Sequence, residues 1–522
     1  MKPPCDEAVI ESGRAAVPCS TKAAPWILAV AILGSGMAFI DSTVVNVALP
    51  ALQTNLGGTV TDIQWVVEAY GLLLGALILV GGSLGDLYGR RQMFLAGVTV
   101  FAGASVACGL APDIHGLIIA RTFQGLGAAF LVPGSLSIIS ASFDEKERGR
   151  AIGTWSGFTA ITTAFGPVLG GWLIEHASWR WAFFINVPIA AAVIVLSLRW
   201  VPKNKAYGTG RVDWFGALAA TAALGGLAYG FIESASLGWS HPYVWGSLIL
   251  GCASMIAFFF IESRVAFPMV PLAFFRSHDF SGANLLTLFL YAALGIFFFL
   301  FPLNLIQIQH YSATATGAAA LPLILLMFLL SRWSGGLVAR YGPGRPLIIG
   351  PVIAAAGFLL FAGPSVGGSY WRTFFPAFLV LGFGLAVSVA PLTTVVMSAV
   401  DQNRAGTASG INNAVARVAG SLAIAVLGVV MTGAFAFHLN RSLADLSLPK
   451  QVVHEVQSNE IRLAALTVPA GVGAEMAAAI RASIQQAFVF GFRLVMLICA
   501  GLSLASAAFA WKMITRRTPG HG

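Results

Sequence analysis

The organisation of this chain is set by the stretch Gly82-Ser-Leu-Gly-Asp86-Leu-Tyr-Gly89-Arg90-Arg91, because the chain contains it twice. Residues 335–345, Gly-Gly-Leu-Val-Ala-Arg-Tyr-Gly-Pro-Gly-Arg, repeat its Gly, Leu, Tyr and Gly at the same spacing 253 residues later. Each copy ends a long apolar run, turns on a glycine, which tolerates a positive φ angle, and meets arginine. Arginine just beyond an apolar span holds that end in the cytoplasm. The repeat therefore predicts a duplicated bundle of membrane helices.

The composition supports a membrane protein. The 522 residues are 57% hydrophobic and only 10% charged, whereas soluble domains carry roughly 25% charged residues. The net charge of +9 comes from basic residues in short loops between apolar runs, so it indicates membrane orientation and not nucleic-acid binding. No CxxC pair or metal-ligand spacing of histidines occurs, so no disulfide framework, metal site or cofactor is expected. The first apolar run holds Asp41 and is interpreted as a retained helix, not a signal peptide.

Fourteen apolar runs bounded by Gly, Pro or charge predict an all-α membrane protein with fourteen transmembrane helices. Their ranges are 26–49, 63–85, 93–111, 115–141, 150–174, 180–200, 213–234, 243–262, 281–307, 314–339, 346–365, 371–399, 405–436 and 484–511. The even number of helices and the distribution of Lys and Arg place both termini in the cytoplasm.

The repeat divides the chain into two pseudo-symmetric six-helix bundles. The expected parts are a tail 1–25, a bundle 26–200, linkers with two inserted helices 201–280, a bundle 281–511 and a tail 512–522. The second bundle carries a long outer loop, 437–482, in which Glu475–Gln486 has a helical pattern and could extend the last helix.

Five further stretches carry a family resemblance. They are Phe39-Ile-Asp41-Ser-Thr43-Val-Val-Asn46-Val-Ala-Leu-Pro50, Arg121-Thr-Phe-Gln124-Gly125-Leu-Gly127, Gly166-Pro167-Val-Leu-Gly170-Gly171, Trp179-Arg-Trp-Ala-Phe-Phe-Ile-Asn186-Val-Pro188 and Gly410-Ile-Asn412-Asn413. With the repeat, they make the chain from about residue 26 to the last helix resemble the major facilitator superfamily, and more narrowly its fourteen-helix drug:proton antiporters. The chain departs from the pattern at Leu87, where a basic residue is usual, at Thr162, where a glycine is expected, and at Ala339, the counterpart of Asp86.

The resemblance implies a gating latch in the first copy of the repeat. Asp86 would pair with an arginine or cap a neighbouring helix when the cytoplasmic side is closed, with Gly89 and Arg90 in the same turn. Plain membrane topology is the alternative explanation for the basic residues. Since the second copy has no acid at this position, the latch is expected on one side only.

A second gating element is expected in the fifth helix. Gly166 and Gly170 lie one turn apart, so another helix can approach closely there, and Pro167 removes a helix hydrogen bond and bends the helix. In the antiporters that the chain resembles, such a helix suits rocking of the halves. Ordinary small-residue packing is the alternative.

Ionisable residues inside membrane spans are costly and are functional by default. Asp41, Glu68 and Arg121 all fall in the outer third of the membrane, at similar depth. We expect Asp41 to be the proton-coupling site with Arg121 as its electrostatic partner, and Glu68 to be a second proton site or a contact for a cationic substrate. The alternatives are a structural hydrogen-bonded acid for Asp41 and a wet helix end for Glu68.

The candidate substrate cavity is drawn from polar and aromatic side chains within the spans, because buried amides need partners. The candidates are Asn46, Gln124, Trp155, Asn284, Asn304, Gln307, Asn412, Asn413 and Arg417. Backbone groups and helix packing are the alternative partners. The spans of the second half hold arginines but no acid, which suits a lipophilic monocation or a neutral amphiphile better than a dication.

Taken together, the sequence predicts a proton-coupled antiporter that exports lipophilic drugs or toxic compounds across the bacterial inner membrane and functions as a monomer. A carrier of a specific metabolite or lipid with the same fold is the main alternative. No nucleophile–base pair, metal cluster or phosphate loop supports an enzyme, and no soluble domain supports a scaffold or sensor. The sequence leaves open the substrate and any periplasmic adaptor protein.

Overall fold

The computed structural model describes residues 23–143, 145–202, 212–400, 405–446, 448–469 and 472–514. These residues form helices and connecting turns, without a β-strand. Up to residue 202 the helices are α2 (Ala24–Leu56), α3 (Val60–Tyr88), α4 (Arg90–Leu110), α5 (Ile114–Ser142), α6 (Glu145–His176), α7 (Trp181–Phe184) and α8 (Asn186–Trp200). The inserted region holds α9 (Trp214–Leu237), α10 (Pro242–Arg264) and the short η1 (Leu272–Arg276). The remainder holds α11 (His278–Leu303), η2 (Asn304–Ile308), α12 (Ala313–Ala319), α13 (Leu321–Tyr341), α14 (Gly344–Phe361), α15 (Phe374–Ser398), α16 (Ala405–Ala444), α17 (Lys450–Ser458), η4 (Glu460–Ala465) and α18 (Ala474–Met513).

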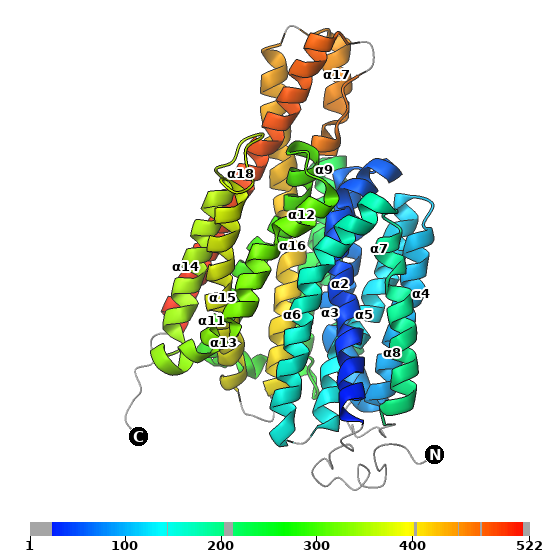
Figure 1. Cartoon of the computed structure of the whole chain (residues 1–522), viewed down its shortest axis with the longest axis vertical. Coiled ribbons are helices and arrows are strands. Elements are labelled where there is room, and N and C mark those ends of the chain that lie inside the picture. The colour runs from blue at the N-terminus through cyan, green and yellow to red at the C-terminus, as the bar shows by residue number, and fades with distance from the viewer. Residues whose placement is uncertain are drawn as a thin grey trace.

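The number of membrane-crossing helices agrees with the prediction. Thirteen segments of the described residues are long and apolar enough to cross a membrane. The 32-residue α6 runs beside them along the bundle and completes the fourteen (Figure 1). All-helical spanning follows because lipid offers backbone N–H and C=O groups no partner. The expected all-α membrane fold is confirmed.

The duplicated glycine turn has the expected geometry in both copies. The first copy ends α3 at Tyr88, and Gly89 then has a φ angle of 100°. The second copy ends α13 at Tyr341, and Gly342 has a φ angle of 76°. Residues with a Cβ atom rarely adopt these angles. Glycine at both positions therefore lets the chain leave one membrane helix and enter the next within a few residues.

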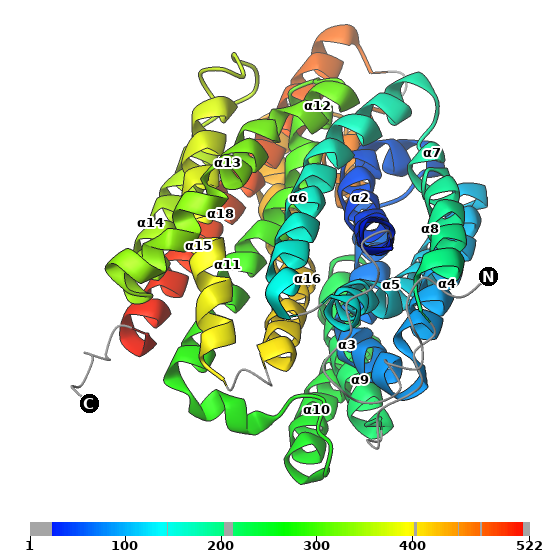
Figure 2. The same cartoon turned by 60° about the horizontal axis from the view of Figure 1, so that its bottom comes forward.

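The helices form two groups that meet along two lines. One group consists of α2 to α8, and the other consists of α11 to α16 and α18. They meet where α3 packs along α16 and where α6 packs against α12. The inserted pair α9–α10 lies outside both groups, with α9 against α3 and α16 (Figure 2).

The segment 437–482 is mostly helical, so the expectation of a long loop there was wrong. The helices α16 and α18 have 40 residues each, a length of about 60 Å against a hydrocarbon layer of about 30 Å. Both extend beyond the rest of the bundle and carry α17 and η4 between them (Figure 1). Helices outside the membrane need no continuous apolar run, so hydropathy does not reveal α17 and η4. Glu475–Gln486 is helical, as expected, and belongs to α18. We call this end of the bundle the hairpin end and the opposite one the termini end.

Two expected helices are interrupted at the hairpin end. The expected helix 314–339 is divided into α12 and α13 at Ala320, just before Pro322, whose nitrogen cannot donate a helix hydrogen bond. The expected helix 281–307 changes after Leu303 into a turn of π-helix, η2. Such turns occur often at functional sites, and both interruptions lie where the two groups of helices meet.

Candidate functional site

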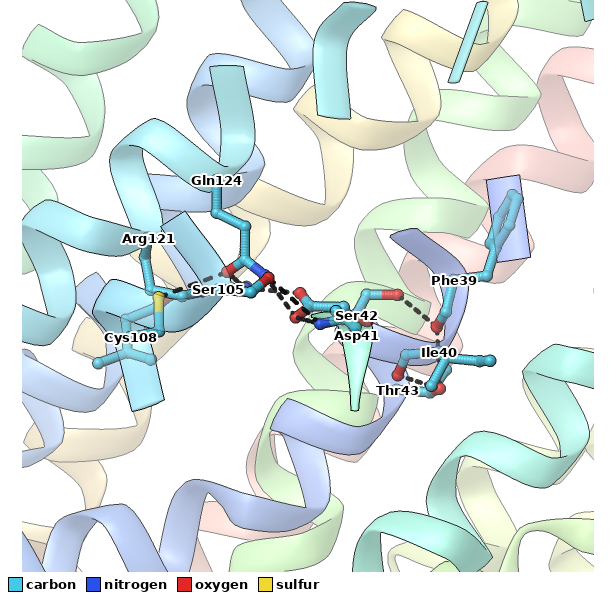
Figure 3. Close-up of polar contacts among 11 residues, drawn as sticks. Phe39, Ile40, Asp41, Ser42, Thr43, Ser105, Cys108, Arg121 and Gln124 are labelled. Atoms are coloured by element: carbon cyan, nitrogen blue, oxygen red, sulfur yellow. Dashed lines mark hydrogen bonds and ion pairs between the residues drawn. The ribbon is translucent and has the colours of Figure 1, made fainter. Parts of the chain in front are cut away.

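The most concentrated polar cluster in the described part of the chain surrounds Asp41 of α2. Its carboxylate Oδ2 lies 2.6 Å from Nη1 of Arg121, and the side chains of Arg121 and Asp41 are 2% and 0% exposed. Gln124 Nε2 donates to Asp41 Oδ1 at 2.7 Å, and Arg121 Nη1 also donates to Gln124 Oε1 at 2.7 Å (Figure 3). Arg121 and Gln124 lie three residues apart on α5, so both side chains leave the helix on one face.

Two more helices complete the surroundings of this carboxylate. Asn186 of α8 donates through Nδ2 to Asp41 Oδ1 at 3.1 Å. Ser105 of α4 accepts from Gln124 Nε2 at 2.8 Å, and Cys108, one turn along α4, lies 3.6 Å from Gln124 Oε1. Side chains of α5 and α8 thus bind Asp41 directly, and side chains of α4 hold Gln124 in place. We call these residues the Asp41 network.

The other side of Arg121 is held by α3. Its Nε donates to the carbonyl of Val66 at 3.1 Å, and its guanidinium lies 4.2 Å from the ring centroid of Tyr70. A buried ion pair is tolerated only when hydrogen bonds and ring contacts satisfy the remaining donors and acceptors. Adding a proton to Asp41 would remove the negative charge that Arg121 pairs with. The hydrogen bonds of the network join five helices, so the packing of all five would be affected.

The sequence predicted two members of the Asp41 network as a pair and missed or misplaced others. Asp41 and Arg121 are together, as expected. Gln124, expected in the substrate cavity, is 0% exposed and binds Asp41 instead. Asn186 and Ser105 were not proposed as site residues. Asn186 lies in the family-like stretch Trp179–Pro188, and this resemblance was the one sequence signal that could have identified it. Ser105 lies in none of the family-like stretches, so no sequence signal pointed to it.

Glu68 does not join this network. Its side chain is 0% exposed, which contradicts a wet helix end, and it lies in a small pocket between α3, α9 and α16. Both of its carboxylate oxygens have no hydrogen-bond partner within the described residues. Asp41 and Glu68 thus face different neighbours, and their similar depth stays a prediction.

The expected latch lies in the turn between α3 and α4. The side chain of Asp86 lies outside the described residues, so its role stays a prediction. Gly89 forms the turn, and Arg90 donates through Nη1 to the carbonyl of Ser137 on α5 at 3.3 Å. Arg91 donates to the carbonyl of Leu198 near the end of α8 at 3.0 Å and to the carbonyl of Val201, just after the helix, at 2.8 Å. The arginines therefore contact helix ends at the termini end of the first group.

The glycines of α6 face two different helices. A Cβ on Gly170 would lie 2.9 Å from Val44 Cγ1 of α2, and Gly166 faces Thr43 of the same helix. A Cβ on Gly171 would instead lie 2.6 Å from the carbonyl carbon of Ala313 at the start of α12. The carbonyl of Pro167 also faces α12, at Gly317. Thus α6 lies between α2 of its own group and α12 of the other.

Three of the expected cavity residues link neighbouring helices within one group. Two of them join α11 to α16, and the third joins α6 to α2. Asn412 of α16 donates through Nδ2 to Asn284 Oδ1 at 3.2 Å and to Thr287 Oγ1 at 2.7 Å, both on α11. Trp155 of α6 donates through Nε1 to Ser35 of α2 at 2.7 Å. Asn284 is only 4% exposed, and the bonds from Asn412 favour the alternative of helix packing for this part of the set.

Gln307 and Asn304 lie at the hairpin end, and not in the middle of the bundle. Gln307 Nε2 donates to Gln53 Oε1 of α2 at 2.9 Å, and Gln53 Nε2 donates to the carbonyl of Arg462 in η4 at 3.2 Å. Asn304 accepts a long bond from Gln309 at 3.5 Å. The two groups of helices and the hairpin therefore meet at Gln53.

The remaining cavity candidates differ in their surroundings. Asn46 is half-buried on α2. Asn413 is exposed and bonds the carbonyl of Ser409 on its own helix at 3.0 Å. Arg417 of α16 lies 5.9 Å from the ring centroid of Phe39 on α2. Of these three, Arg417 contacts both groups of helices.

Two groups of membrane-spanning helices with an inserted pair beside them, and a charge pair buried inside the first group, are the architecture of a multi-pass membrane transporter. A model of the Major Facilitator Superfamily matches residues 31–424, and the chain belongs to that family. It is 33% identical to the tetracenomycin C resistance and export protein of Streptomyces glaucescens over 97% of this chain and 94% of that protein. It is 36% identical to the multidrug resistance protein Stp of Mycobacterium tuberculosis over 79% of this chain and 78% of that protein.

A solved structure shares the fold across nearly the whole chain. It is a bacterial homolog of the human lysosomal transporter Spinster in an inward-facing, unoccupied conformation, with a TM-score of 0.64. The match covers 96% of this chain and 100% of that one at 17% sequence identity. The likeness therefore concerns the fold, whereas the sequence relatives are resistance and export proteins.

Proposed function

We propose that this protein exports lipophilic antibiotics or other toxic compounds across the bacterial inner membrane in exchange for protons. The observation that carries the proposal is the Asp41 network, a buried carboxylate held by an arginine in a family whose similar members are named for drug resistance and export. An ionisable pair inside a membrane span costs free energy, so it is retained where it has a task. Proton exchange is the task that suits a carboxylate.

The proposed orientation places the termini end in the cytoplasm and the hairpin end outside. The distribution of Lys and Arg supports it, since basic residues gather in the short loops of the termini end. The proposed parts are the bundles 26–200 and 281–511, with the inserted region 201–280 and the tails 1–25 and 512–522. The proposed partners of a working monomer are protons, one small lipophilic substrate and, in cells with an outer membrane, a periplasmic adaptor protein.

The proposed coupling runs through Arg121. With Asp41 ionised, the guanidinium is shared between Asp41, Gln124 and the Val66 carbonyl. A proton on Asp41 would cancel the charge that holds Arg121, so α5 could shift against α2 and α3. Substrate and proton would then favour opposite arrangements of the helices, which is the thermodynamic requirement for exchange.

The proposed substrate surface lies between the two groups of helices. Arg417 and Asn413 of α16 and Asn46 of α2 remain the candidates for contact with substrate, and Asp86, Gly89, Arg90, Gly166, Pro167 and Gly170 the candidates for gating. A positively charged Arg417 near the substrate favours a neutral amphiphile or a cation whose charge lies elsewhere. Lipophilic compounds suit the many aromatic side chains of the spans.

The test uses inside-out membrane vesicles with an acidic interior and a pH-sensitive dye. Lipophilic cations and neutral amphiphiles are added one at a time, and the wild type is compared with Asp41→Asn. We expect compound-dependent proton release in the wild type and none in Asp41→Asn. The control that keeps the release is Asn55→Ala, because Asn55 is exposed at the hairpin end of α2 and bonds the carbonyl of Ala51 on its own helix. Release that persists in Asp41→Asn would refute the coupling role of Asp41. A wild type that is silent with every compound would favour a carrier of a specific metabolite or lipid.

A further inference from the structure

One face of α3 packs along α16 at the line where the two groups of helices meet. Gln64 Nε2 donates to the carbonyl of Ile424 at 3.1 Å near the hairpin end of this line. Two turns further on, a Cβ on Gly71 would lie 2.7 Å from Ser421 Oγ. Positions 64, 68, 71 and 75 share one helix face because they are three or four residues apart. Glu68 therefore belongs to the face that contacts α16.

Glu68 is buried and lines a small pocket in this contact. The pocket is lined by Gly71 of α3, by Ser421 and neighbouring residues of α16, and by Leu224 and Ala228 of α9. The side chain is 0% exposed, and neither carboxylate oxygen has a hydrogen-bond partner in the described part of the chain. The inserted helix α9 forms the outer wall, so it separates this acid from the lipid.

The pocket is separate from the Asp41 network. Tyr70, which packs on Arg121, follows Glu68 by two residues, and two residues on an α-helix differ in direction by about 200°. The two side chains thus leave α3 on nearly opposite faces. A proton on Glu68 and a proton on Asp41 would act on different helix contacts.

The charged side chains on the helices around Glu68 are occupied elsewhere. The guanidinium of Arg417 on α16 points toward Phe39 of α2, at 5.9 Å from its ring centroid, and makes no ion pair with Glu68 among the described residues. Glu233 of α9 accepts from Trp65 Nε1 at 2.8 Å, and Arg121 of α5 pairs with Asp41. Serine is the polar residue that shares the pocket with Glu68. An ionised carboxylate there would lack both an ion pair and a full set of hydrogen bonds, which is the costly way to bury a charge.

We propose that Glu68 is a second proton-binding site, and that a proton must occupy it before α3 and α16 can pack together at the hairpin end. When α3 and α16 separate there, water reaches the carboxylate and exchanges a proton with it. When they close, the neutral acid is buried and its O–H can donate to Ser421. Closing the hairpin end thus takes up one proton from the water on that side, and opening it returns the proton.

This proposal also gives the inserted helices a task. Without α9, the pocket between α3 and α16 would open to lipid. With α9 in place, the acid is buried while the contact is closed, and separation of α3 from α16 is the route by which water enters. The inference rests on the proposed proton-coupled export, which it extends to a second acid.

The test measures the opening of the hairpin end against pH without substrate. Spin labels are placed at the exposed positions Asn55 on α2 and Arg481 on α18 of the full chain in nanodiscs, after replacement of its five cysteines. Double electron–electron resonance then gives the ratio of closed to open molecules between pH 5 and pH 9. One linked proton changes this ratio by up to about tenfold for each pH unit.

We expect the closed fraction of the wild type to rise as the pH falls. Glu68→Gln, which mimics the neutral acid, should be more closed than the wild type at high pH. The logarithm of its closed-to-open ratio should also change less steeply with pH, by the equivalent of one linked proton. Glu68→Asp should keep that slope, and Glu233→Gln is the control that should match the wild type. A slope in Glu68→Gln equal to that of the wild type would overturn the inference, as would a wild type without any response to pH. If the closed fractions of the wild type and of Glu68→Gln respond to pH as expected, but no compound releases protons in the vesicle assay, only the proposed function is refuted.

Discussion

The contact between α6 and α12 offers a direct test of how the two groups of helices move. In this structure the contact is closed, and Gly171 is the residue that permits it. A Cβ at this position would lie 2.6 Å from the carbonyl carbon of Ala313 and 2.7 Å from Cα of Thr314. Both are backbone atoms, so no side-chain rotation can relieve the clash. We predict that Gly171→Ala destabilises the closed arrangement.

The magnitude follows from the distances. Ordinary contacts of Cβ begin at 3.4 Å, so relieving the 2.6 Å contact alone requires α6 and α12 to separate by about 0.8 Å, and the nearer carbonyl oxygen of Ala313 requires more. Overpacking of this kind costs about 1–3 kcal/mol, which corresponds to a shift of about 5- to 150-fold toward the open arrangement. The shift is opposite in sign to the one expected for Glu68→Gln.

The assay is the distance measurement between labels at positions 55 and 481, at one fixed pH. Two matched controls are available. In Gly97→Ala the new Cβ would lie 2.7 Å from the backbone nitrogen of Leu131 in its own group, so this change should lower thermal stability with little effect on the closed fraction. Gly336→Ala has no atom of the described residues within 4 Å of the new Cβ and should change neither quantity. The reasoning is refuted if Gly171→Ala keeps the closed fraction of the wild type.

Three further predictions concern single sites. Asp41→Asn leaves Arg121 buried without its counter-ion, so it should destabilise the protein by about 3–5 kcal/mol in thermal unfolding, and the added change Arg121→Gln should recover part of the loss. Gly89→Ala forces a Cβ onto a φ angle of 100°, so it should cost about 1–2 kcal/mol in the same measurement, and no loss would contradict the strained turn. In the hairpin, burial raises the pKa of Glu460 against an opposing hydrogen bond from Asn440, so the folded hairpin binds a proton more tightly than the unfolded one. Its protection from hydrogen exchange should therefore fall as the pH rises above the ordinary range of a glutamate, and Glu460→Gln should remove this dependence.

The sequence by itself determined the elements and their turns. Lipid forces each apolar run of sufficient length into a helix, so the number of spans followed from hydropathy. The turns at Gly89 and Gly342 followed from the repeat, because a positive φ angle requires glycine. Asp41 and Arg121 stood out for a similar reason: a charge inside a span is costly, and two opposite charges at one depth are expected to pair.

Only the tertiary structure decided which neighbour each side chain meets. Periodicity shows which residues share a face of one helix, but the rotation of that helix against its neighbours is set by packing over the whole bundle. For this reason Gln124 could be recognised as polar and buried, yet not as a ligand of Asp41, and Gln307 could not be placed beside Gln53. Glu68 and Tyr70 are two residues apart in sequence, but only the packing of α3 against α5 on one side and α16 on the other gives them different neighbours.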